Sequence, residues 1–400
     1  MANNNTRLKR KTDEIRNWLL ERAVFMPDLG DALTELCERI VAAGVPIARS
    51  ATVVQLLNAS TQAVGREWHL GGKTIERLFP YGAQSDRSYE RSPYAQAHRT
   101  GEWVEIRPMA VSPDAYGVVP ELKAGGFTHY VCIPLSFSNG RKRNGLTFAT
   151  KHPSGFSAVD FAFLRSLVPA IRSVMEIRAG ERILDEILQT YVGGDPHKRI
   201  LAGDIHRGKV TRIKSALLFS DLRGFTNLSM ILPEEDITDL LNRYFDCVVP
   251  EVEQRGGEVL KFIGDGVLAI FQEHEGHTIG ACTQALAAAK ASLARIARAN
   301  MLGSLPAPLI AGIALHYGEA AYGNVGSGQR LDFTVIGRDV NIANRITRLN
   351  EKLGQPILMS QAFASQLKVG AQHLGEFEFK GVPGEHALLK PLQDEEIARS

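Results

Sequence analysis

Two aspartates, Asp221 and Asp265, stand where a sheet can bring carboxylates together. Asp221 follows the short apolar run 216–219, and Asp265 lies in a Gly-Asp-Gly turn between two further apolar runs. Such runs predict buried strands, and an Asp-Gly turn between them predicts a tight hairpin. Two carboxylates with no histidine or cysteine in either motif suit hard ions such as Mg²⁺ or Mn²⁺, which usually arrive with phosphates. A turn aspartate also often does no more than cap its own turn.

Further residues suit a nucleotide. The turn 222–226 (LRGFT) leads toward a helix, so its backbone N–H groups, including those of Phe225 and Thr226, can bind phosphate oxygens. Asn341 and Arg345 lie four residues apart in a predicted helix, which places both on one face. An Asn and an Arg on one face can bind a sugar oxygen and a phosphate together. Such a pair is more often an ordinary solvated helix face.

The elements that must position these residues follow a definite order. Apolar residues at helical spacing predict a helix from about Pro233 to the pair Gly256-Gly257, and an Ala-rich helix is predicted over about 277–299. Strands are predicted at 216–219, on both sides of Asp265, and at 309–315. Strand, helix, hairpin, helix, strand is the ferredoxin-like βαββαβ plan within an α+β fold. Its two central strands are neighbours, so both aspartates meet at one edge of the sheet.

Four segments of this half resemble the catalytic domain of the class III nucleotide cyclases: LLFSDLRGFT, GGEVLKFIGDGVLAIF, GNVGS and DFTVIGRDVNIANR. The resemblance covers roughly 205–392, in the family's order and spacing. The preceding stretch YVGGDPHKRILAGDIHRG is similar to the transducing segment found before many bacterial cyclase domains. The resemblance implies a lyase that forms a 3′,5′-cyclic nucleotide and pyrophosphate.

The resemblance implies a role for each matching residue. Asp221 and Asp265 match the two metal-binding aspartates, and the backbone carbonyl of Leu222 is a third metal ligand. Asn341 matches the residue that orients the ribose. Arg345 matches the residue that stabilises charge on the α-phosphate.

Three other positions bear on the substrate. Lys261 matches the lysine that contacts adenine, and Thr334 falls where many bacterial adenylate cyclases have Thr. Guanylate cyclases generally carry Glu and Cys at these two places, so the pair favours ATP over GTP. Lys380, in FEFKG, matches a lysine near the terminal phosphates. A guanylate cyclase remains the alternative among the enzymes.

In this family the site is shared between two chains. The dimer is head-to-tail, so one chain supplies the metal aspartates and the other supplies the four residues Lys261, Thr334, Asn341 and Arg345. A homodimer then has two equivalent sites and a monomer has none. The resemblance also implies two ions per site, Mg²⁺ or Mn²⁺, and an in-line attack of the ribose 3′-oxygen on the α-phosphorus.

The first half of the chain is of another kind. An N-terminal helix (1–27) is predicted within a helical stretch 6–43, followed by a domain over 28–178. Short apolar runs separated by Gly, Pro, Ser and Asn predict an antiparallel sheet, with a hairpin at Ser138-Asn139-Gly140. The stretch 130–171 resembles a GAF domain, a sensor module, which implies an unknown small-molecule ligand. A dimerisation domain without a ligand is the alternative.

A long helical connector is predicted over 159–195. Its apolar seam is close to heptad spacing, which favours pairing with a second chain, and packing on its own domain is the alternative. Ala179-Gly180 is predicted to be a joint, and Gly193-Gly194 is predicted to break the helix. With 179–204 as the linker, the seam suggests that a signal in the N-terminal domain regulates the catalytic one.

Composition sets the remaining limits. The 46 basic residues nearly balance 44 acidic ones, which argues against nucleic acid as the main partner. The four cysteines are far apart, so neither a zinc site nor a disulfide framework is predicted, and they fit a reducing cytoplasm. No run approaches the length of a membrane span.

The last predictions concern a histidine-containing segment, the C-terminal residues and an alternative function. His274-Glu275-Gly276-His277 is predicted to be solvent-exposed rather than a metal cluster, because no third ligand lies nearby, and 393–400 is predicted to be a C-terminal tail. A non-catalytic sensor, in which the C-terminal half only dimerises, is the alternative from another functional class. The retained aspartates together with Asn341 and Arg345 argue against it.

Overall fold

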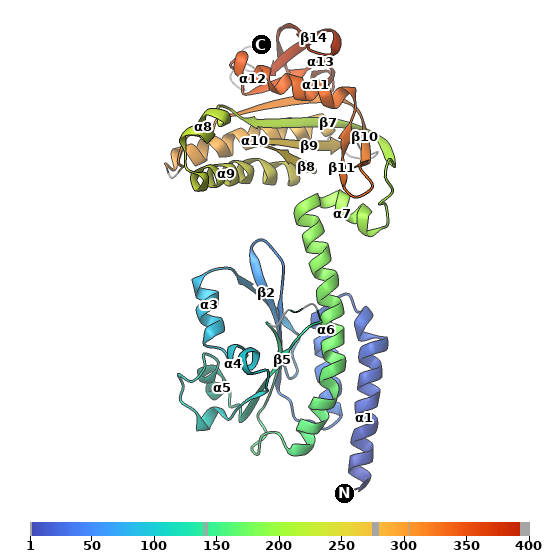
Figure 1. Ribbon diagram of the computed structural model, residues 1–400, viewed down its shortest axis with the longest axis vertical. Helices are drawn as coiled ribbons and strands as arrows, with labels where there is room; N and C mark the ends of the chain where they lie inside the picture. Colours follow the sequence, from blue (N-terminus) through green and yellow to red (C-terminus); the bar gives the residue numbers. More distant parts are fainter. Residues whose placement is uncertain (1, 139, 141–142, 274–279, 304, 393–400) are drawn as a thin grey trace. The chain divides into compact units, whose positions relative to one another are not determined.

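The computed structural model describes residues 2–138, 140, 143–273, 280–303 and 305–392 (Figure 1). The chain divides into two units, Met1–Thr190 and Tyr191–Ser400. The division falls inside the segment expected to be the linker. None of the helices in the described ranges combines the length and the apolar character needed to cross a membrane.

The N-terminal unit is built on a six-stranded sheet in the order β3-β2-β1-β6-β5-β4. All of its pairings are antiparallel, which confirms the predicted sheet. Strands β5 and β6 pair as a hairpin, although Asn139 of the predicted turn lies outside the described residues. The strands are β1 (Arg49–Gln55), β2 (Thr61–His69), β3 (Ile75–Pro80), β4 (Val104–Ile106), β5 (His129–Leu135) and β6 (Asn144–Thr150).

Helices cover both faces of this sheet (Figure 1). One face packs on α1 (Ala2–Glu21), α2 (Leu29–Ala42) and α6 (Ala158–Val192), and the other on α4 (Pro93–Thr100) and α5 (Val119–Ala124). Helix α3 (Ala83–Glu90) lies on the second side without a buried residue. Strand alternation divides the two cores: Val131 and Ile133 belong to the first, Tyr130 and Cys132 to the second.

Two helices, α1 and α2, occupy the helical stretch predicted over 6–43. The short 3₁₀ turn η1 (Ala23–Phe25) follows α1. The Asp28 carboxylate then accepts the backbone N–H groups of Gly30 at 2.6 Å and Asp31 at 2.9 Å, which caps the start of α2.

Helix α6 runs unbroken for 35 residues. Gly180 lies inside it, so the predicted joint is wrong. The first half of its seam, including Leu164, Leu167 and Ile171, is buried in the core of its own unit. The pairing predicted for that half is therefore wrong, and the alternative of packing on its own domain is confirmed there. The predicted break is confirmed at Gly193, where φ is +96°.

The C-terminal unit contains an eight-stranded sheet in the order β13-β14-β12-β10-β7-β9-β8, with β11 paired to β10. Within it, β8-β9-β7-β10 is the ferredoxin-like order, which confirms the predicted plan. Among the strand pairings in the described part of this unit, the one between β10 and β12 alone is parallel. The strands are β7 (Val210–Leu222), β8 (Glu258–Ile263), β9 (Gly266–Gln272), β10 (Ala311–Gly326), β11 (Leu331–Ile336), β12 (Ile357–Ser360), β13 (Ala371–Phe379) and β14 (Val382–Pro391).

The two faces of this sheet differ. Helices α9 (Glu234–Glu253) and α10 (Ala281–Met301) pack on one face, whereas β11 and α11 (Arg338–Thr347) cover the other (Figure 1). Shorter helices complete the unit: α7 (Gly194–Leu201), α8 (Phe225–Ile231), α12 (Leu349–Lys352) and α13 (Gln361–Ala364).

Three sequence predictions differ from this structure. The strand expected at 309–315 continues to Gly326, because pairing with β7 extends far beyond its apolar stretch. The last two residues of the turn expected at 222–226 are already the first two residues of the short helix α8. The Ala-rich helix begins at Ala281 rather than near 277, and His274-Glu275-Gly276-His277 lies outside the described residues.

A partly buried polar cluster joins helix α7 to the sheet. The Tyr322 hydroxyl lies 3.0 Å from Asp195 Oδ2 and 3.1 Å from Glu258 Oε1. The backbone N–H of Asp195 donates to Glu258 Oε1 at 3.0 Å, and Arg199 pairs with Asp195 Oδ2 at 2.7 Å. Burial, and next the charge of Asp195, raises the pKa of Glu258 to about 7.

This cluster makes stability depend on pH. Since folding raises the Glu258 pKa from an ordinary value of 4.5 to about 7, ionised Glu258 opposes folding. The cost is absent below pH 4.5, grows as pH rises, and is complete above pH 7, at no more than about 3 kcal/mol. We expect Glu258→Gln to raise the melting temperature at pH 8 and to change it little at pH 4.5, as measured by calorimetry.

The matched control is Glu253→Gln, at the exposed end of α9. It should leave both melting temperatures unchanged. An equal effect of Glu258→Gln at the two pH values would contradict the assigned ionisation.

Candidate active site

The carboxylates of Asp221 and Asp265 meet at one edge of the C-terminal sheet. Strand β7 lies between β9 and β10, with Ser220 opposite Val267 of β9 and Asp221 opposite Gly312 of β10. Asp265 lies in the tight turn between β8 and β9. The two carboxyl groups are within hydrogen-bonding contact, which agrees with the prediction that their strands are neighbours in the sheet.

Packing on both sides of Asp221 fixes this edge. The Ser220 hydroxyl lies 2.5 Å from the Tyr244 hydroxyl of α9, and Leu222 is buried in the core beneath that helix. Side chains alternate along a strand, so Asp221 must point to the opposite face. A Cβ at Gly266 would lie 3.3 Å from the Ser220 carbonyl oxygen, so the hairpin tip approaches β7 closely because residue 266 has no side chain.

The electrostatics of the pair fit a divalent cation. Partial burial, followed by the hydrogen bond and charge of Asp265, raises the pKa of Asp221 to about 6. The described residues contain no cluster of three histidine, cysteine or acidic side chains. Two carboxylates and the Leu222 carbonyl are instead an all-oxygen donor set, which suits Mg²⁺ or Mn²⁺. A cation bound there would offset the charge of Asp265, which is one of the causes that raise the pKa of Asp221.

The turn after Asp221 presents backbone donors. Gly224 has φ of +72° and precedes the first residue of α8, Phe225. Because the first N–H groups of a helix have no intrahelical acceptor, those of Phe225 and Thr226 are available to an anion. The Arg223 guanidinium donates to the Gln355 carbonyl, so it is already engaged.

Helix α11 presents Asn341 and Arg345 on its outer side. Ile342 and Ile346 bury the other side against the sheet. Asp339 anchors the helix start, since its Oδ2 accepts the Glu319 N–H of β10 at 2.8 Å. Asn341 is exposed and Arg345 is half-buried, and neither side chain has a hydrogen bond or ion pair with another described residue.

Lys261 has a partner that sequence reasoning missed. Its Nζ lies 2.6 Å from Asp332 Oδ2, which ties β8 to β11. Asp332 precedes Thr334 by two residues, so strand alternation places both on one face. That spacing was the available signal. Thr334 is buried, and its Oγ1 has no hydrogen-bond partner among the described residues.

The structure thus brings some candidates together and leaves others apart. Asp221 meets Asp265, and Lys261 meets Asp332 near Thr334. In the described ranges no hydrogen bond or ion pair joins these two groups to each other. Lys380 lies in the turn between β13 and β14, exposed and without such a bond to any of them.

We expect Mn²⁺ to bind at the paired carboxylates. Asp221→Asn and Asp265→Asn should each weaken Mn²⁺ binding at least about tenfold, because each removes one negative ligand. Electron paramagnetic resonance of free Mn²⁺ during a titration of the full chain measures this. Asp246→Asn, at an exposed position of α9, is the matched control and should change nothing. Equal affinity in all three variants would exclude this pair as the metal site.

Comparison with known proteins finds matches in this unit. Residues 211–390 match the family model of the adenylate and guanylate cyclase catalytic domain. An adenylate cyclase of Anabaena cylindrica is 32% identical over 166 residues, which cover 41% of this chain and 33% of that protein. Adenylate cyclase 1 of Rhizobium meliloti (strain 1021) is 30% identical over 189 residues, which cover 46% of this chain and 28% of that protein. The chain therefore spans a third or less of the length of these two relatives.

Among solved structures, the adenylyl cyclase CyaB from P. aeruginosa aligns with 46% of this chain and 97% of its own. The identity is 30% and the TM-score is 0.40.

Proposed function

We propose that this chain, which carries an adenylate/guanylate cyclase catalytic domain at 211–390, converts ATP into 3′,5′-cyclic AMP and pyrophosphate. The observation that carries the proposal is the contact between Asp221 and Asp265 at one sheet edge, inside the matched domain. The sequence resemblance, in which both aspartates match the family's metal-binding pair, supports the same proposal.

The preference for ATP rests on hydrogen-bond chemistry. The Lys261 ammonium can only donate, and the Thr334 hydroxyl can accept. Adenine offers an acceptor at N1 and a donor at its amino group, so both contacts are satisfied. Guanine carries a proton at N1, so a lysine that faces N1 would meet a donor instead of an acceptor. The Thr334 hydroxyl can also donate, so it would not by itself reject the C6 carbonyl of guanine. Asp332 holds Lys261 in position before the base arrives.

The roles of the remaining residues follow from where charge develops. Asn341 orients the ribose, so that its 3′-oxygen can attack the α-phosphorus. Arg345 stabilises the negative charge that grows on the α-phosphate, so it acts mainly in the transition state. The N–H groups of Phe225 and Thr226 bind the other phosphates, and Lys380 contributes at the terminal ones.

Asp221, Asp265 and the Leu222 carbonyl would hold two Mg²⁺ or Mn²⁺ ions. When bound, such ions supply Lewis-acid chemistry that favours an ionised 3′-hydroxyl and neutralises the triphosphate. The carboxylates themselves position the ions, and their mutual repulsion makes the site selective for strong positive charge.

We further propose that two copies of the chain share each site head-to-tail. Within the described part of one chain, no bond joins the Asp221–Asp265 pair to Lys261, Asn341 or Arg345. Large apolar side chains near these aspartates are also exposed, with Phe262 at 51%, Ile263 at 52% and Met230 at 78%. A second copy would cover such surface and complete the site.

The N-terminal unit is proposed to regulate the reaction. Its antiparallel sheet between two helical layers supports the GAF-like reading of residues 28–178. Helix α6 starts in the core of that unit and continues to Val192, directly before the catalytic unit's own α7.

The reaction is tested with purified full chain, ATP or GTP, and Mg²⁺ or Mn²⁺, with the product identified by chromatography. We expect cyclic AMP from ATP. Arg345→Ala should reduce turnover about 10²–10³-fold with a smaller effect on KM, because the contact it removes belongs to the transition state. The control is Arg338→Ala, exposed at the start of the same helix. Cyclic GMP as the main product would overturn the base assignment, and no cyclic product would favour a sensor.

The shared site predicts complementation. Asp221→Ala and Asn341→Ala chains should each be inactive alone. A mixed dimer keeps one intact site, so co-purified heterodimers should recover up to about half of the parent activity, since two equivalent sites serve one dimer. Two tags verify the heterodimer. Inactive heterodimers would contradict the shared site while leaving the metal site intact.

A further inference from the structure

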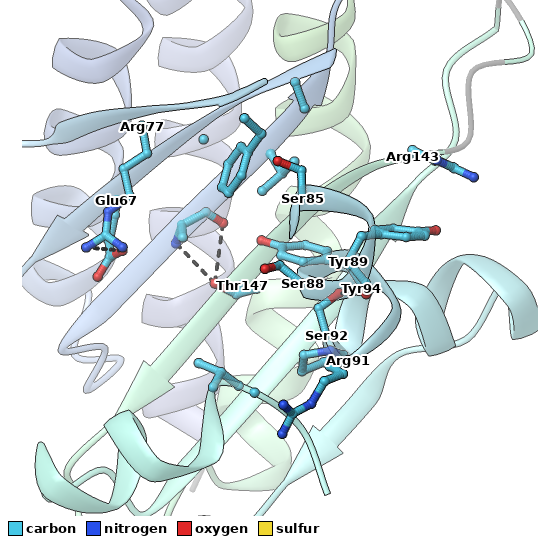
Figure 2. A pocket seen from close by; sticks show the side chains of 18 of the residues that line it. Glu67, Arg77, Ser85, Ser88, Tyr89, Arg91, Ser92, Tyr94, Arg143 and Thr147 are labelled. Carbon is cyan, nitrogen blue, oxygen red and sulfur yellow. Dashed lines mark hydrogen bonds and ion pairs between the residues drawn. The ribbon is translucent and has the colours of Figure 1, made fainter. Parts of the chain in front are cut away.

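The N-terminal unit contains a cavity of about 630 Å³ that the catalytic chemistry does not use. It lies between the sheet and helices α3 and α4 (Figure 2). Small-molecule sites in proteins typically enclose roughly 300–1,000 Å³. The cavity is therefore large enough for a ligand, and what it binds does not depend on the proposed function of 211–390.

The sequence creates this space on one face of the sheet only. Ala51 of β1 and Ala63 and Gly65 of β2 line the cavity, whereas Val54 and Val64 fill the core on the opposite face. Small side chains at alternate positions of paired strands leave a hollow where larger ones would fill it. These three residues therefore form an apolar floor of the cavity.

The walls press closely onto this floor. A Cβ at Gly65 would lie 2.9 Å from the Phe79 ring, and a Cβ at Gly145 would lie 2.3 Å from the Tyr94 ring. The aromatic walls rest directly on glycines, so the cavity has a defined shape. The lining therefore offers aromatic surface to the apolar body of a ligand.

The lining carries an excess of positive charge. It includes six arginines and two glutamates. Arg49 pairs with Glu67 at 2.9 Å and with Glu121 at 3.3 Å, so both glutamates are engaged by one arginine. Arg77 also faces Glu67, at 3.7 Å.

Three arginines of the lining have no carboxylate partner among the described residues. Arg66 has a partner outside the lining, Glu76, at 2.6 Å. Arg87, Arg91 and Arg143 pair with no carboxylate in the described part of the chain, and Arg143 stacks on the Tyr89 ring at 4.7 Å. Arg87, Arg91 and Arg143 are exposed, so they stand at the rim of the cavity, where unpaired guanidinium groups attract carboxylate, phosphate or sulfonate groups.

Neutral donors complete the lining from the helical side. Figure 2 shows Ser85, Ser88 and Tyr94 gathered opposite Thr147 of the sheet. The Tyr94 hydroxyl is buried without a hydrogen-bond partner among the described residues. Burial raises the pKa of Tyr94 well above its ordinary value, so the hydroxyl stays protonated and can donate.

We propose that this cavity binds a small organic anion with a flat apolar body. The body lies on the Ala51–Gly65 floor against Phe79 and Tyr94. Arg87 and Arg91, at the end of α3 and directly after it, bind the anionic group.

Two fluorescent probes separate charge from shape. 1-Anilinonaphthalene-8-sulfonate is an anion with a flat naphthalene ring, and N-phenyl-1-naphthylamine is nearly the same molecule without the sulfonate. We expect the full chain to bind the anion with one site per chain. The double variant Arg87→Gln/Arg91→Gln should weaken anion binding at least about tenfold and change binding of the neutral probe less than about twofold, since only the anion loses charge-assisted hydrogen bonds in this variant.

Two further variants locate the site. Ala51→Leu should fill the floor and abolish binding of both probes, with a circular dichroism spectrum like that of the parent to show that it folds. Arg99→Gln, an exposed residue of α4 outside the lining, should bind the anion as the parent does.

The outcomes are decisive in each direction. Anion binding that survives Ala51→Leu in a folded chain would place the probe elsewhere and overturn the proposal. Equal weakening of both probes by the arginine variant, or none, would overturn the anionic class. If Ala51→Leu does not fold, Ala63→Leu from the adjacent strand makes the same test, with the same results expected.

Discussion

The pairing of β7 on both of its edges is the constraint on which the C-terminal unit depends. Strand β7 bonds to β9 on one side and to β10 on the other. The first register places Ser220 opposite Val267, and the second places Asp221 opposite Gly312. A slip of one residue would turn every side chain of β7 to the opposite face. Asp221 would then point at α9, and Ser220 would lose the hydroxyl of Tyr244.

The same alternation makes one face of that sheet mainly apolar and leaves polar side chains on the other. The face under α9 and α10 is filled by apolar side chains and supplies most of the burial. The other face is covered by β11 and α11, which are held through polar contacts such as Asp332 with Lys261 and Asp339 with the Glu319 N–H. Candidate site residues lie on the second face because there the covering elements leave polar side chains at the surface.

Short sequence patterns predicted the helices and strands of the C-terminal unit better than they predicted contacts between distant segments. The ferredoxin-like order followed from apolar runs, a Gly-Asp-Gly turn and helical spacing, all of which are encoded within short segments. The contact of Asp221 with Asp265 followed from that order. The partner of Lys261 did not, because Asp332 is 71 residues away and only the folding of β11 onto β8 brings it near.

Other features depended on packing that a pattern does not contain. Gly180 interrupts the seam in sequence, yet α6 continues through it because tertiary contacts outweigh the weak helix propensity of one glycine. The alternation in β1 predicts two faces but does not say that one of them stays hollow. The length of β10 likewise came from its partner strand rather than from its own polar second half.

The raised pKa of Asp221 has a consequence for how this sequence is maintained. Two carboxylates held against each other, one of them partly buried, cost folding free energy, so many substitutions of either residue would make the fold more stable. Random change under selection for stability alone would therefore remove the pair. A cation that binds the pair would offset this cost, so selection for a bound cation would keep what selection for stability alone removes.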